Sequence, residues 1–362
     1  MLKPLSVCRE EAVKHYSVIV VGGGPGGSSV AGHLDLDHLS DGALMIEKLD
    51  DGKFNRYNQM CGEGISRRGL AEAGLERADL QRNAVTKAVE HWPDGITLSS
   101  DINGSIIDRG KLIACLRKPF VSSGGEMVNG TVSRARRTNG GYVVESSEGA
   151  FSCRYLVGAD GAHSIIRRMV FDVEPSTYMR VIQYLVDRPM ENELHFTFDQ
   201  RYMGKYRWEF PSGRHTKVGF PEGTDEAPRD AVDTHRRAIP IGRPDKIVDG
   251  GACLVGDAAC QANPITFGGI RNSLAAGRMA ADAINHGNIE DYQLKWERSP
   301  LADSTFLDVF NRLRWKTNEE LAMLVKPLRY GPNVSAIMRE LMNCDDFRTF
   351  YRGFVRKMEN GW

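Results

Sequence analysis

The chain has 362 residues, and its 47 basic and 47 acidic side chains give a formal net charge of zero. This balance argues against a nucleic acid as the main partner, and no apolar run approaches the roughly 20 residues that span a bilayer. Seven scattered cysteines without a CxxC pair, and histidines without companion ligands, argue against a disulfide framework or a metal site and fit a reducing cytosol. Residues 1–15 lack the apolar core of a signal peptide. We therefore expect a cytoplasmic protein, lying at most against a membrane surface, with one large domain or two closely joined ones.

A glycine turn follows the first buried strand. The β-branched run Tyr16–Val21 is typical of a parallel strand, and a GxGxxG spacing falls directly after it, on Gly22, Gly24 and Gly27. In this pattern the first glycine permits a tight turn, the second lets the backbone approach a pyrophosphate, and the third lets a helix pack closely on the strand. A second strand ends in Glu47, about twenty residues past the last glycine, where an acid can accept from a ribose hydroxyl. Together these features predict a dinucleotide site at a helix N-terminus.

Two later strand ends also carry acids. A buried run leads into Asp160, which can accept from hydroxyls or from backbone donors at a turn. A similar run leads into Asp257, which is placed to accept from a sugar-like hydroxyl. Gly268, Gly269 and Ile270 then present backbone N–H groups at the start of a helix, and such groups suit an anion or a carbonyl.

A glycine-rich loop and the start of a helix lie between Glu47 and Asp160. In Cys61–Ile65 two glycines flank an acid, which indicates backbone held near something flat or anionic; an ordinary glycine loop with a buried thiol is the alternative. Residues 106–116 predict the beginning of a helix, with Arg109 near its first turn. A cation gains nothing from the helix dipole there, so we expect Arg109 to reach outward, to a cofactor or to solvent.

The sequence pattern changes over residues 171–241, where segments of alternating apolar and polar residues predict an antiparallel sheet. Tyr206, Trp208 and Phe210 recur at period two, so their rings share one face of a strand and either line a cavity or form plain sheet core. From Tyr292 onward the apolar spacing is helical and amphipathic, which predicts a tail packed on the core. The expected fold is α/β: a Rossmann-like FAD-binding domain (residues 1–170 and 242–288), an interleaved antiparallel-sheet substrate domain (171–241) and a helical C-terminal region (289–362).

The three acid-bearing strand ends, in this order, resemble the FAD-binding fold of the aromatic-hydroxylase-like flavoproteins over most of the chain. Two motifs narrow the resemblance. Cys61–Ile65 resembles the Cys-x-Glu-Gly-Ile element of the geranylgeranyl reductase family, and Tyr206–Pro211 resembles its Tyr-x-Trp-x-Phe-Pro element. That family reduces isolated double bonds in polyprenyl chains of archaeal membrane lipids or chlorophyll precursors, and the form of the first motif is more similar to the archaeal lipid branch.

Taken together, the patterns and the resemblance predict a set of FAD contacts, with Val132 acting through its backbone. The predicted contacts are Gly22, Gly24, Gly26, Gly27, Glu47, Cys61, Gly62, Gly64, Arg109, Val132, Asp160, Asp257, Gly268, Gly269 and Ile270. The resemblance also implies a prenyl cavity lined by Tyr206, Trp208, Phe210 and Gly219. It puts Cys61 near the reactive ring of the flavin, as the catalytic candidate.

The implied reaction delivers a hydride from reduced flavin to one alkene carbon and a proton to the other, and an aromatic wall can stabilise developing positive charge. Cys61 and a bound water are the candidate proton donors. The implied partners are a prenylated lipid, an external electron donor (NADPH, ferredoxin or a deazaflavin) and a peripheral membrane contact. Phe267 departs from the family, which usually has glycine there, and its ring would narrow the approach to the flavin.

Three alternatives stay open at this point. The first is a FAD-dependent monooxygenase or hydroxylase on the same scaffold. The second is a reductase of another prenylated substrate, such as a quinone or a chlorophyll precursor. The third is a flavin-binding or lipid-carrier protein without catalytic activity.

Overall fold

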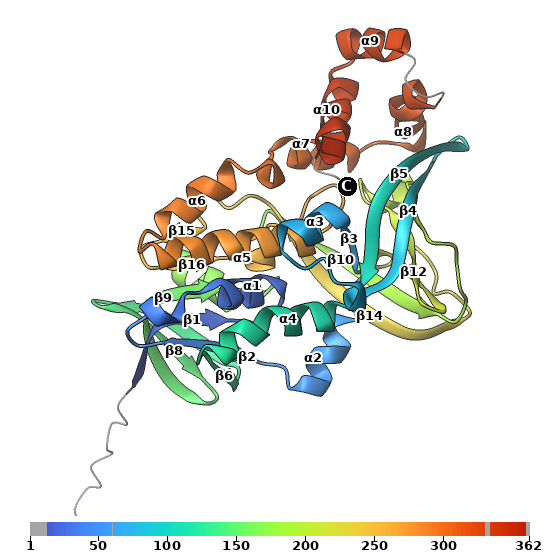
Figure 1. Cartoon of the computed structure of the whole chain (residues 1–362). Coiled ribbons are helices and arrows are strands. Elements are labelled where there is room, and N and C mark those ends of the chain that lie inside the picture. Colours follow the sequence, from blue (N-terminus) through green and yellow to red (C-terminus); the bar gives the residue numbers. More distant parts are fainter. Residues whose placement is uncertain (1–12, 60, 330–333, 360–362) are drawn as a thin grey trace, which may run out of the picture.

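The computed structural model describes residues 13–59, 61–329 and 334–359, so most of the N-terminal segment 1–15 lies outside the described residues. Two eight-stranded sheets and a group of helices make up the described chain (Figure 1). The strands are β1 (Lys14–Val21), β2 (Ala43–Glu47), β3 (Gly64–Ser66), β4 (Gln81–Trp92), β5 (Ile96–Ile107), β6 (Glu126–Asn129), β7 (Val132–Thr138), β8 (Gly141–Ser146), β9 (Gly149–Gly158), β10 (Thr177–Val186), β11 (Glu193–Thr197), β12 (Arg207–Ser212), β13 (His215–Pro221), β14 (Ala231–Ile241), β15 (Val248–Asp249) and β16 (Ala252–Leu254). The helices are α1 (Pro25–His33), α2 (Asp51–Asn58), α3 (Arg67–Glu72), α4 (Arg109–Ser122), α5 (Ile270–Asn285), α6 (Glu290–Glu297), α7 (Thr305–Leu313), α8 (Asn318–Val325), α9 (Val334–Asn343) and α10 (Asp345–Glu359).

The first sheet has a parallel centre. Its strands follow the order β15-β16-β9-β1-β2-β6, and β16, β9, β1, β2 and β6 pair in parallel. Apolar residues of β1 and β2 are fully buried, as expected for strands covered on both faces. Since parallel strands end at one edge, the turns after all five strands gather there, and this is where α/β sheets bind ligands.

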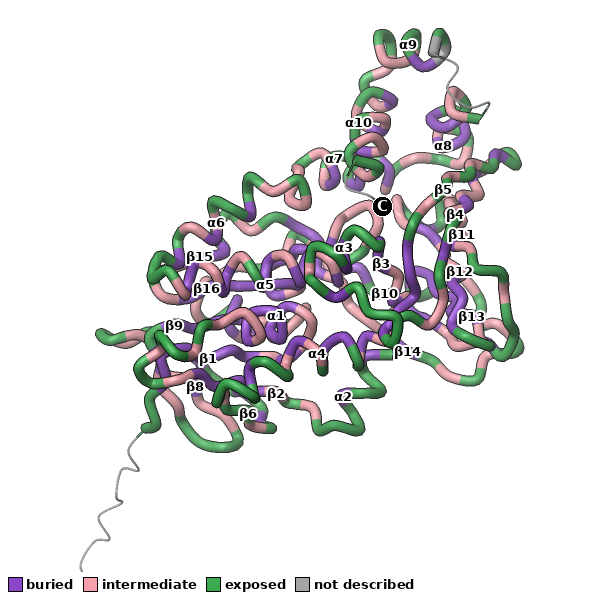
Figure 2. Tube along the Cα trace, in the orientation of Figure 1, coloured by how far each residue is buried: buried purple, intermediate pink, exposed green. Residues whose placement is uncertain are grey.

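Helices α1 and α5 pack closely beside this sheet. A Cβ on Gly277 of α5 would lie 2.6 Å from the carbonyl oxygen of Gly26, and the Ser29 hydroxyl donates to the Leu274 carbonyl across 2.8 Å. Figure 2 shows buried residues concentrated along both helices. Small residues in both helices therefore bring the N-terminal ends of α1 and α5 to the same edge of the sheet.

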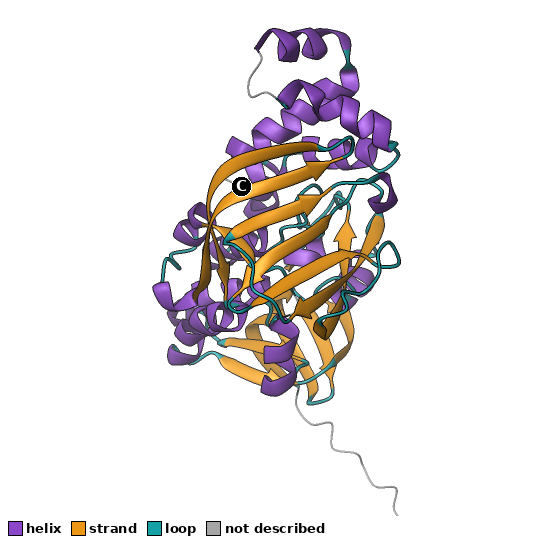
Figure 3. Ribbon diagram, turned by 90° about the vertical axis from the view of Figure 1, so that its right-hand side faces the viewer, coloured by secondary structure: helices purple, strands orange, loops and turns teal. Residues whose placement is uncertain are grey.

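The second sheet has the order β14-β10-β13-β12-β11-β4-β5-β3 and forms a broad twisted layer (Figure 3). It is antiparallel except where β11 runs parallel to β4. Its inner face carries the aromatic residues of β11 and β12, and its outer face carries ion pairs such as Lys87 with Glu193.

The expected fold class is confirmed, but two details differ. Strands β3, β4 and β5 belong to the second sheet, although the sequence division put residues 64–107 in the first domain. Their pairing with β11 joins segments far apart in the chain, which local patterns do not reveal. Residues 106–107 end β5 rather than beginning a helix, because α4 starts at Arg109 after the cap residue Asp108.

The C-terminal helices gather beyond β4 and β5 at one end of the molecule (Figure 1). On α7, Phe306, Val309, Phe310 and Leu313 are all buried, which confirms that this part of the tail packs on the core. None of the described helices is long and apolar enough to cross a bilayer.

Candidate functional site

The glycine turn after β1 has the geometry that its spacing predicts. Gly22 has φ of +97°, and a Cβ there would lie 2.3 Å from the carbonyl oxygen of Ala159, so the tight turn requires glycine. A Cβ on Gly27 would lie 1.9 Å from the Gly22 carbonyl oxygen, which explains the close approach of α1. A Cβ on Gly24 would meet nothing within 4 Å, so the backbone there faces open space. The α1 N-terminus also has no side-chain cap.

Glu47 ends β2 directly beside this turn. Its carboxylate accepts from the backbone N–H of Gly23 at 2.7 Å and of Leu49 at 2.9 Å. Arg117 of α4 reaches the same turn, where its guanidinium donates to the Gly23 carbonyl and to the Ser28 hydroxyl and lies 4.1 Å from the Phe54 ring centroid. An acid and a cation therefore flank the open backbone at Gly24.

The turn after β16 holds Asp257 among cations. Burial raises the pKa of Asp257, although Arg237, Arg109 and Arg167 act in the opposite direction. A Cβ on Gly269 would lie 3.6 Å from an oxygen of Asp257, so the predicted residues Asp257 and Gly269 do come together. Gly269 caps α5 without a side-chain hydrogen bond, which leaves the α5 N-terminus available to a bound group.

Asp160 and Val132 lie at the same edge with different surroundings. Both carboxylate oxygens of Asp160 accept from within its own turn, from the Ser164 hydroxyl and from the backbone N–H of Ile165. Asp160 therefore stabilises a turn, which was one of its two expected roles. Val132 begins β7 just after Gly130, whose N–H donates to the Glu47 carbonyl across 2.9 Å.

Four buried side-chain polar atoms of the described residues have no hydrogen-bond partner: Asn58 Oδ1, Arg109 Nε, Arg167 Nε and His235 Nδ1. Arg109 donates to the carbonyl of Tyr57, next to Asn58, and Arg167 approaches the carbonyl of Asp257. Arg109 is thus buried rather than solvated. An unpaired buried polar atom costs about 1–3 kcal/mol, so each of these atoms is a polar group that a bound molecule could satisfy.

The two motifs of the family resemblance contact each other. A Cβ on Gly62 would lie 2.8 Å from the Phe210 ring, so the loop Cys61–Ile65 rests on the aromatic strand β12. Gly64 then begins β3 and pairs with Ile106. The Cys61 sulfur accepts from the Glu63 N–H at 3.4 Å and is close enough to influence Tyr206 electrostatically.

A buried ion pair fixes this contact. Glu63 has φ of +59°, and its carboxylate binds the ammonium group of Lys217, which lies opposite Phe210 in the β12–β13 pair. Both side chains are buried, and burial lowers the pKa of Lys217 while the attraction of Glu63 acts the other way. The other Glu63 oxygen lies 3.4 Å from the backbone N–H of Arg109, so one carboxylate joins the loop, the second sheet and α4.

Tyr206, Trp208 and Phe210 form a layer on the inner face of the second sheet with Phe196, whose ring centroid lies 5.1 Å from Tyr206 and 5.4 Å from Phe210. Trp208 donates to the Gln183 side chain across 3.3 Å, and its ring lies over Gly219. Burial raises the pKa of Tyr206, whose hydroxyl donates to the Thr266 carbonyl. The four predicted substrate residues therefore share one surface with the Cys61–Ile65 loop.

Phe267 lies against this layer. It has φ of +53°, which a non-glycine residue adopts at a cost, and its ring centroid lies 5.3 Å from that of Tyr206 and 6.3 Å from that of Phe310. The ring therefore links the loop before α5 to β12 and α7. Exposed Gly268 follows it.

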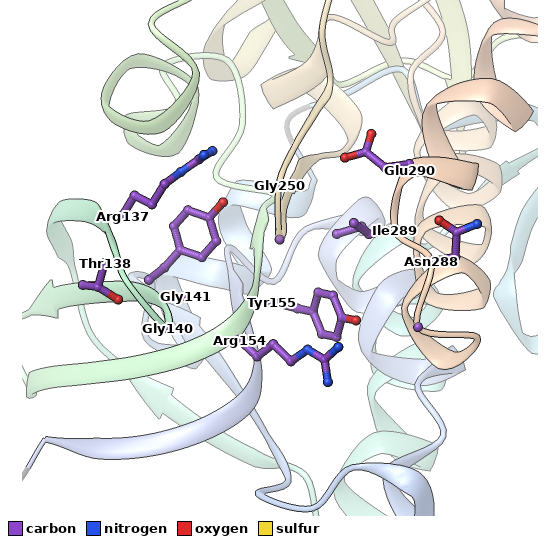
Figure 4. Close-up of a pocket in the computed structure, with 13 residues that line it drawn as sticks. Arg137, Thr138, Gly140, Gly141, Arg154, Tyr155, Gly250, Asn288, Ile289 and Glu290 are labelled. Atoms are coloured by element: carbon purple, nitrogen blue, oxygen red, sulfur yellow. The ribbon is translucent and has the colours of Figure 1, made fainter.

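A surface pocket of about 420 Å³ lies elsewhere, beside the amino end of β16 (Figure 4). Tyr142 and Arg137 line it, and both bind Asp249, so their polar groups are satisfied within the protein. This pocket is on the opposite side from the turns that carry the predicted site residues, and it has no part in the site.

Sequence reasoning missed Lys217, Arg117, Gln183 and Arg237. Arg237 packs on the Tyr57 ring, with its guanidinium carbon 3.3 Å from the ring centroid, and donates to the Tyr57 carbonyl. Lys217 sits in a strand whose neighbours are apolar, and a charge at an otherwise buried strand position was the available signal.

Substitution Gly219→Ala is expected to displace Trp208, since the new Cβ would lie 2.0 Å from the ring. The Trp208 ring would lose its hydrogen bond to Gln183. We expect the free energy of unfolding, measured by thermal unfolding, to fall by about 1–3 kcal/mol, and the tryptophan fluorescence to change. Gly140→Ala is the control, because a Cβ at Gly140 would meet nothing within 4 Å. Its free energy of unfolding should stay within about 0.5 kcal/mol of that of the unmodified protein. Equal stability of both variants would contradict this account of Gly219.

Substitution Lys217→Met is expected to lower the free energy of unfolding by about 3 kcal/mol. It removes the closest partner of the buried Glu63 carboxylate, which keeps only the more distant Arg82 at 3.8 Å. The double variant Glu63→Gln/Lys217→Met should recover most of this loss, since neither charge remains. Lys87→Met, which breaks the exposed pair with Glu193 on the same sheet, serves as the control and should cost at most about 1 kcal/mol. Additive losses in the double-variant cycle, measured by denaturant unfolding, would argue against the coupling.

No family model matches the chain, but curated proteins and solved structures do. A digeranylgeranylglycerophospholipid reductase of Methanopyrus kandleri is 29% identical, over 78% of this chain and 82% of the relative. A chloroplastic geranylgeranyl diphosphate reductase of Oryza sativa subsp. japonica is also 29% identical, over 92% of this chain and 79% of the relative.

Among solved structures, a geranylgeranyl bacteriochlorophyll reductase-like protein from Thermoplasma acidophilum has a TM-score of 0.77 at 21% identity, over 97% of this chain and 100% of the other. A flavin-dependent brominase has a TM-score of 0.63 at 18% identity, over 96% of this chain and 94% of the other. The fold is thus one that flavoproteins of different activities share. The resemblance carried by Cys61–Ile65 and Tyr206–Pro211 is confirmed: the chain is a homologue of the geranylgeranyl reductases.

Proposed function

We propose that this protein is a FAD-dependent reductase that saturates C=C bonds of geranylgeranyl or related polyprenyl chains, those of archaeal membrane lipids in particular. One observation carries the proposal: the Cys61–Ile65 loop rests on the aromatic strand, with Gly62 directly against Phe210, while Gly69 of the following helix α3 packs on Arg271 in the first turn of α5. A dinucleotide site and an apolar aromatic surface therefore adjoin. The reductase names of the curated homologues support the same reading.

The residues at the edge fit FAD. The open backbone at Gly24 and the uncapped start of α1 would hold the pyrophosphate, with Gly22, Gly26 and Gly27 shaping the turn. Glu47 would accept from the adenosine ribose, and Asp257 from the ribityl chain. The N-terminus of α5 at Gly268–Ile270 and the loop at Cys61, Gly62 and Gly64 would meet the flavin ring. The unpaired Nε atoms of Arg109 and Arg167 supply polar groups that such a ligand would satisfy.

Reduced FAD bound there would supply a hydride to one alkene carbon. The chain's own part is to hold the alkene in a dry, aromatic setting. Tyr206, Trp208 and Phe210 present ring faces that favour positive charge developing at the more substituted carbon. A prenyl chain gains about 25 cal/mol per Å² of apolar surface that this layer buries. Cys61 is the loop residue that we assign nearest to the reacting atoms.

The proposal implies a prenylated lipid as substrate and an external reductant that restores the flavin. NADPH, ferredoxin and a deazaflavin are the candidate donor classes.

The test is an anaerobic single turnover. We expect the flavin-loaded, chemically reduced protein to be reoxidised by a geranylgeranyl lipid, with a mass gain of two hydrogens for each double bond reduced. A saturated phytanyl lipid is the matched control and should leave the flavin reduced. Spectrophotometry follows the flavin, and mass spectrometry follows the lipid.

Other outcomes would replace the proposal. A product that forms only with oxygen would identify a monooxygenase. Lipid binding without flavin reoxidation would identify a binding or carrier protein. Protein that folds but takes up no FAD would remove the assigned chemistry altogether.

We propose further that the C-terminal helices touch the membrane that holds the lipid. Trp315 is 76% exposed, Met342 of α9 is 74% exposed and Met323 of α8 is 65% exposed. Large apolar side chains so exposed at one end of a molecule are typical of an interaction surface. Arg314, whose guanidinium lies 4.8 Å from the Trp315 ring centroid, adds a cation that suits anionic headgroups.

In a flotation assay the full-length protein is expected to rise with vesicles that contain anionic lipid. The triple variant Trp315→Ser/Met323→Ser/Met342→Ser should bind about 10²-fold more weakly, because each of the three side chains would contribute of the order of 1 kcal/mol when buried. A control with serine at the exposed Met127 and Met169, which lie in the other part of the fold, should bind as the unmodified protein does. Unmodified protein that stays at the bottom of the gradient would contradict the contact.

A further inference from the structure

His235 of β14 is buried, and only one of its two ring nitrogens has a partner. Its exposed fraction is 6%, its Nε2 lies 3.2 Å from a carboxylate oxygen of Asp233, and its Nδ1 is buried without a partner among the described residues. The Asp233 contact selects the neutral tautomer with the proton on Nε2, which leaves Nδ1 as an unused acceptor. Such an atom costs about 1–3 kcal/mol unless a ligand completes it.

The strand register puts His235 on the face that carries the aromatic layer. His235 lies opposite Gln183, Gln183 opposite Gly219, and Gly219 opposite Trp208. Directly opposite residues of antiparallel strands point to the same face. The Trp208 ring crosses Gly219 to donate to Gln183, so a single side chain separates the indole from His235.

The other neighbours of His235 belong to the cofactor side. Arg237 is the next residue on this face of β14, and it packs on Tyr57 at the end of α2, just before the Cys61–Ile65 loop. Arg56 of α2 pairs with Asp233 at 3.3 Å. His235 therefore shares the face of the predicted prenyl surface, and its neighbours Asp233 and Arg237 contact α2, which precedes the Cys61–Ile65 loop.

The charges that face the imidazole come from three elements: Asp233 and Arg237 on β14, Lys217 on β13 and Arg56 on α2. Burial lowers the pKa of His235, and Arg56, Lys217 and Arg237 lower it further while Asp233 raises it. An imidazolium with a lowered pKa is a stronger acid, and Asp233 still holds its ring in one orientation.

We propose that His235 is the general acid that protonates the alkene carbon which does not receive the hydride. The inference rests on the proposed reductase function. In this step the C=C π bond, the Nδ1–H bond and the N–H bond of reduced flavin that carries the hydride would break, and one C–H bond would form at each carbon. The flavin would lose the two electrons of that hydride. The imidazole becomes neutral and keeps its Nε2 proton toward Asp233.

The experiment compares flavin-loaded His235→Gln with the unmodified protein in anaerobic single turnovers with a geranylgeranyl lipid between pH 5 and 9. In the unmodified protein the rate should be highest at low pH and fall as the pH rises through a pKa below the usual histidine value of about 6.5, because the acid must be protonated. In His235→Gln the rate at low pH should drop by about 10²-fold or more, and this pH dependence should vanish.

Three readouts separate proton delivery from a structural role. The absorption spectrum of the bound flavin, the lipid dissociation constant and the rate of reoxidation by oxygen should all stay unchanged in His235→Gln. His195→Gln is the matched control, because His195 lies on the outer face of the same sheet beside His91, and it should keep the full rate and pH profile. NMR of the imidazole nitrogens should show the Nε2–H tautomer at neutral pH, whether or not flavin is bound.

The outcomes are distinct. A His235→Gln rate and pH profile equal to those of the unmodified protein would overturn the inference while the reductase function stands. His235→Asn is the second variant should the first unfold, and normal turnover by it would also overturn the inference. Failure of the unmodified protein to turn over any prenyl lipid would overturn both proposals together. A lower rate in Cys61→Ser with an unchanged pH dependence would support the inference, because it would show that Cys61 is not the group whose protonation the rate requires.

Discussion

The buried pair of Glu63 and Lys217 is the interaction on which the arrangement of the two sheets depends. Glu63 comes from the loop that meets the parallel sheet's edge, and Lys217 comes from the centre of the second sheet. Neither side chain of the pair is exposed to water, so each charge depends on the other, and Glu63 has Arg82 as a second, more distant partner at 3.8 Å. The pair therefore ties the Cys61–Ile65 loop to β12 and β13, and through that loop it sets where an aromatic surface meets a nucleotide site.

The convergence of strand ends supplies the other half of the site. Turns after β1, β2, β9 and β16 hold Gly22, Glu47, Asp160 and Asp257, and the pairing of these strands brings them to one edge. Three arginines from different elements surround Asp257. A chain without net charge thus concentrates cations at one place, where they suit a ligand that carries phosphates.

The parts of the site that follow local rules could be predicted from the sequence. The roles of Gly22 and Gly27 follow from a turn pattern, and the adjacency of Asp257 and Gly269 follows from their place in one short connection between β16 and α5. Their contacts with a flavin stay predictions. Lys217 and His235 could not be predicted, because their meaning depends on the register between strands that are distant in the chain. For the same reason the pairing of β3–β5 with the second sheet was not predicted: the chain enters that sheet early and returns to it after β9. The division into domains stays a prediction.

The strained backbone at Phe267 has a consequence for how the site behaves as a ligand arrives. Its left-handed conformation is held by ring contacts with Tyr206 on β12 and Phe310 on α7 rather than by any intrinsic preference of phenylalanine. A molecule that enters the aromatic layer competes for the same contacts, and displacing the ring releases the backbone one residue before Gly268. Binding at the aromatic layer and the conformation of the α5 N-terminus are therefore coupled. A ligand bound at either place changes the affinity of the other place for its own ligand.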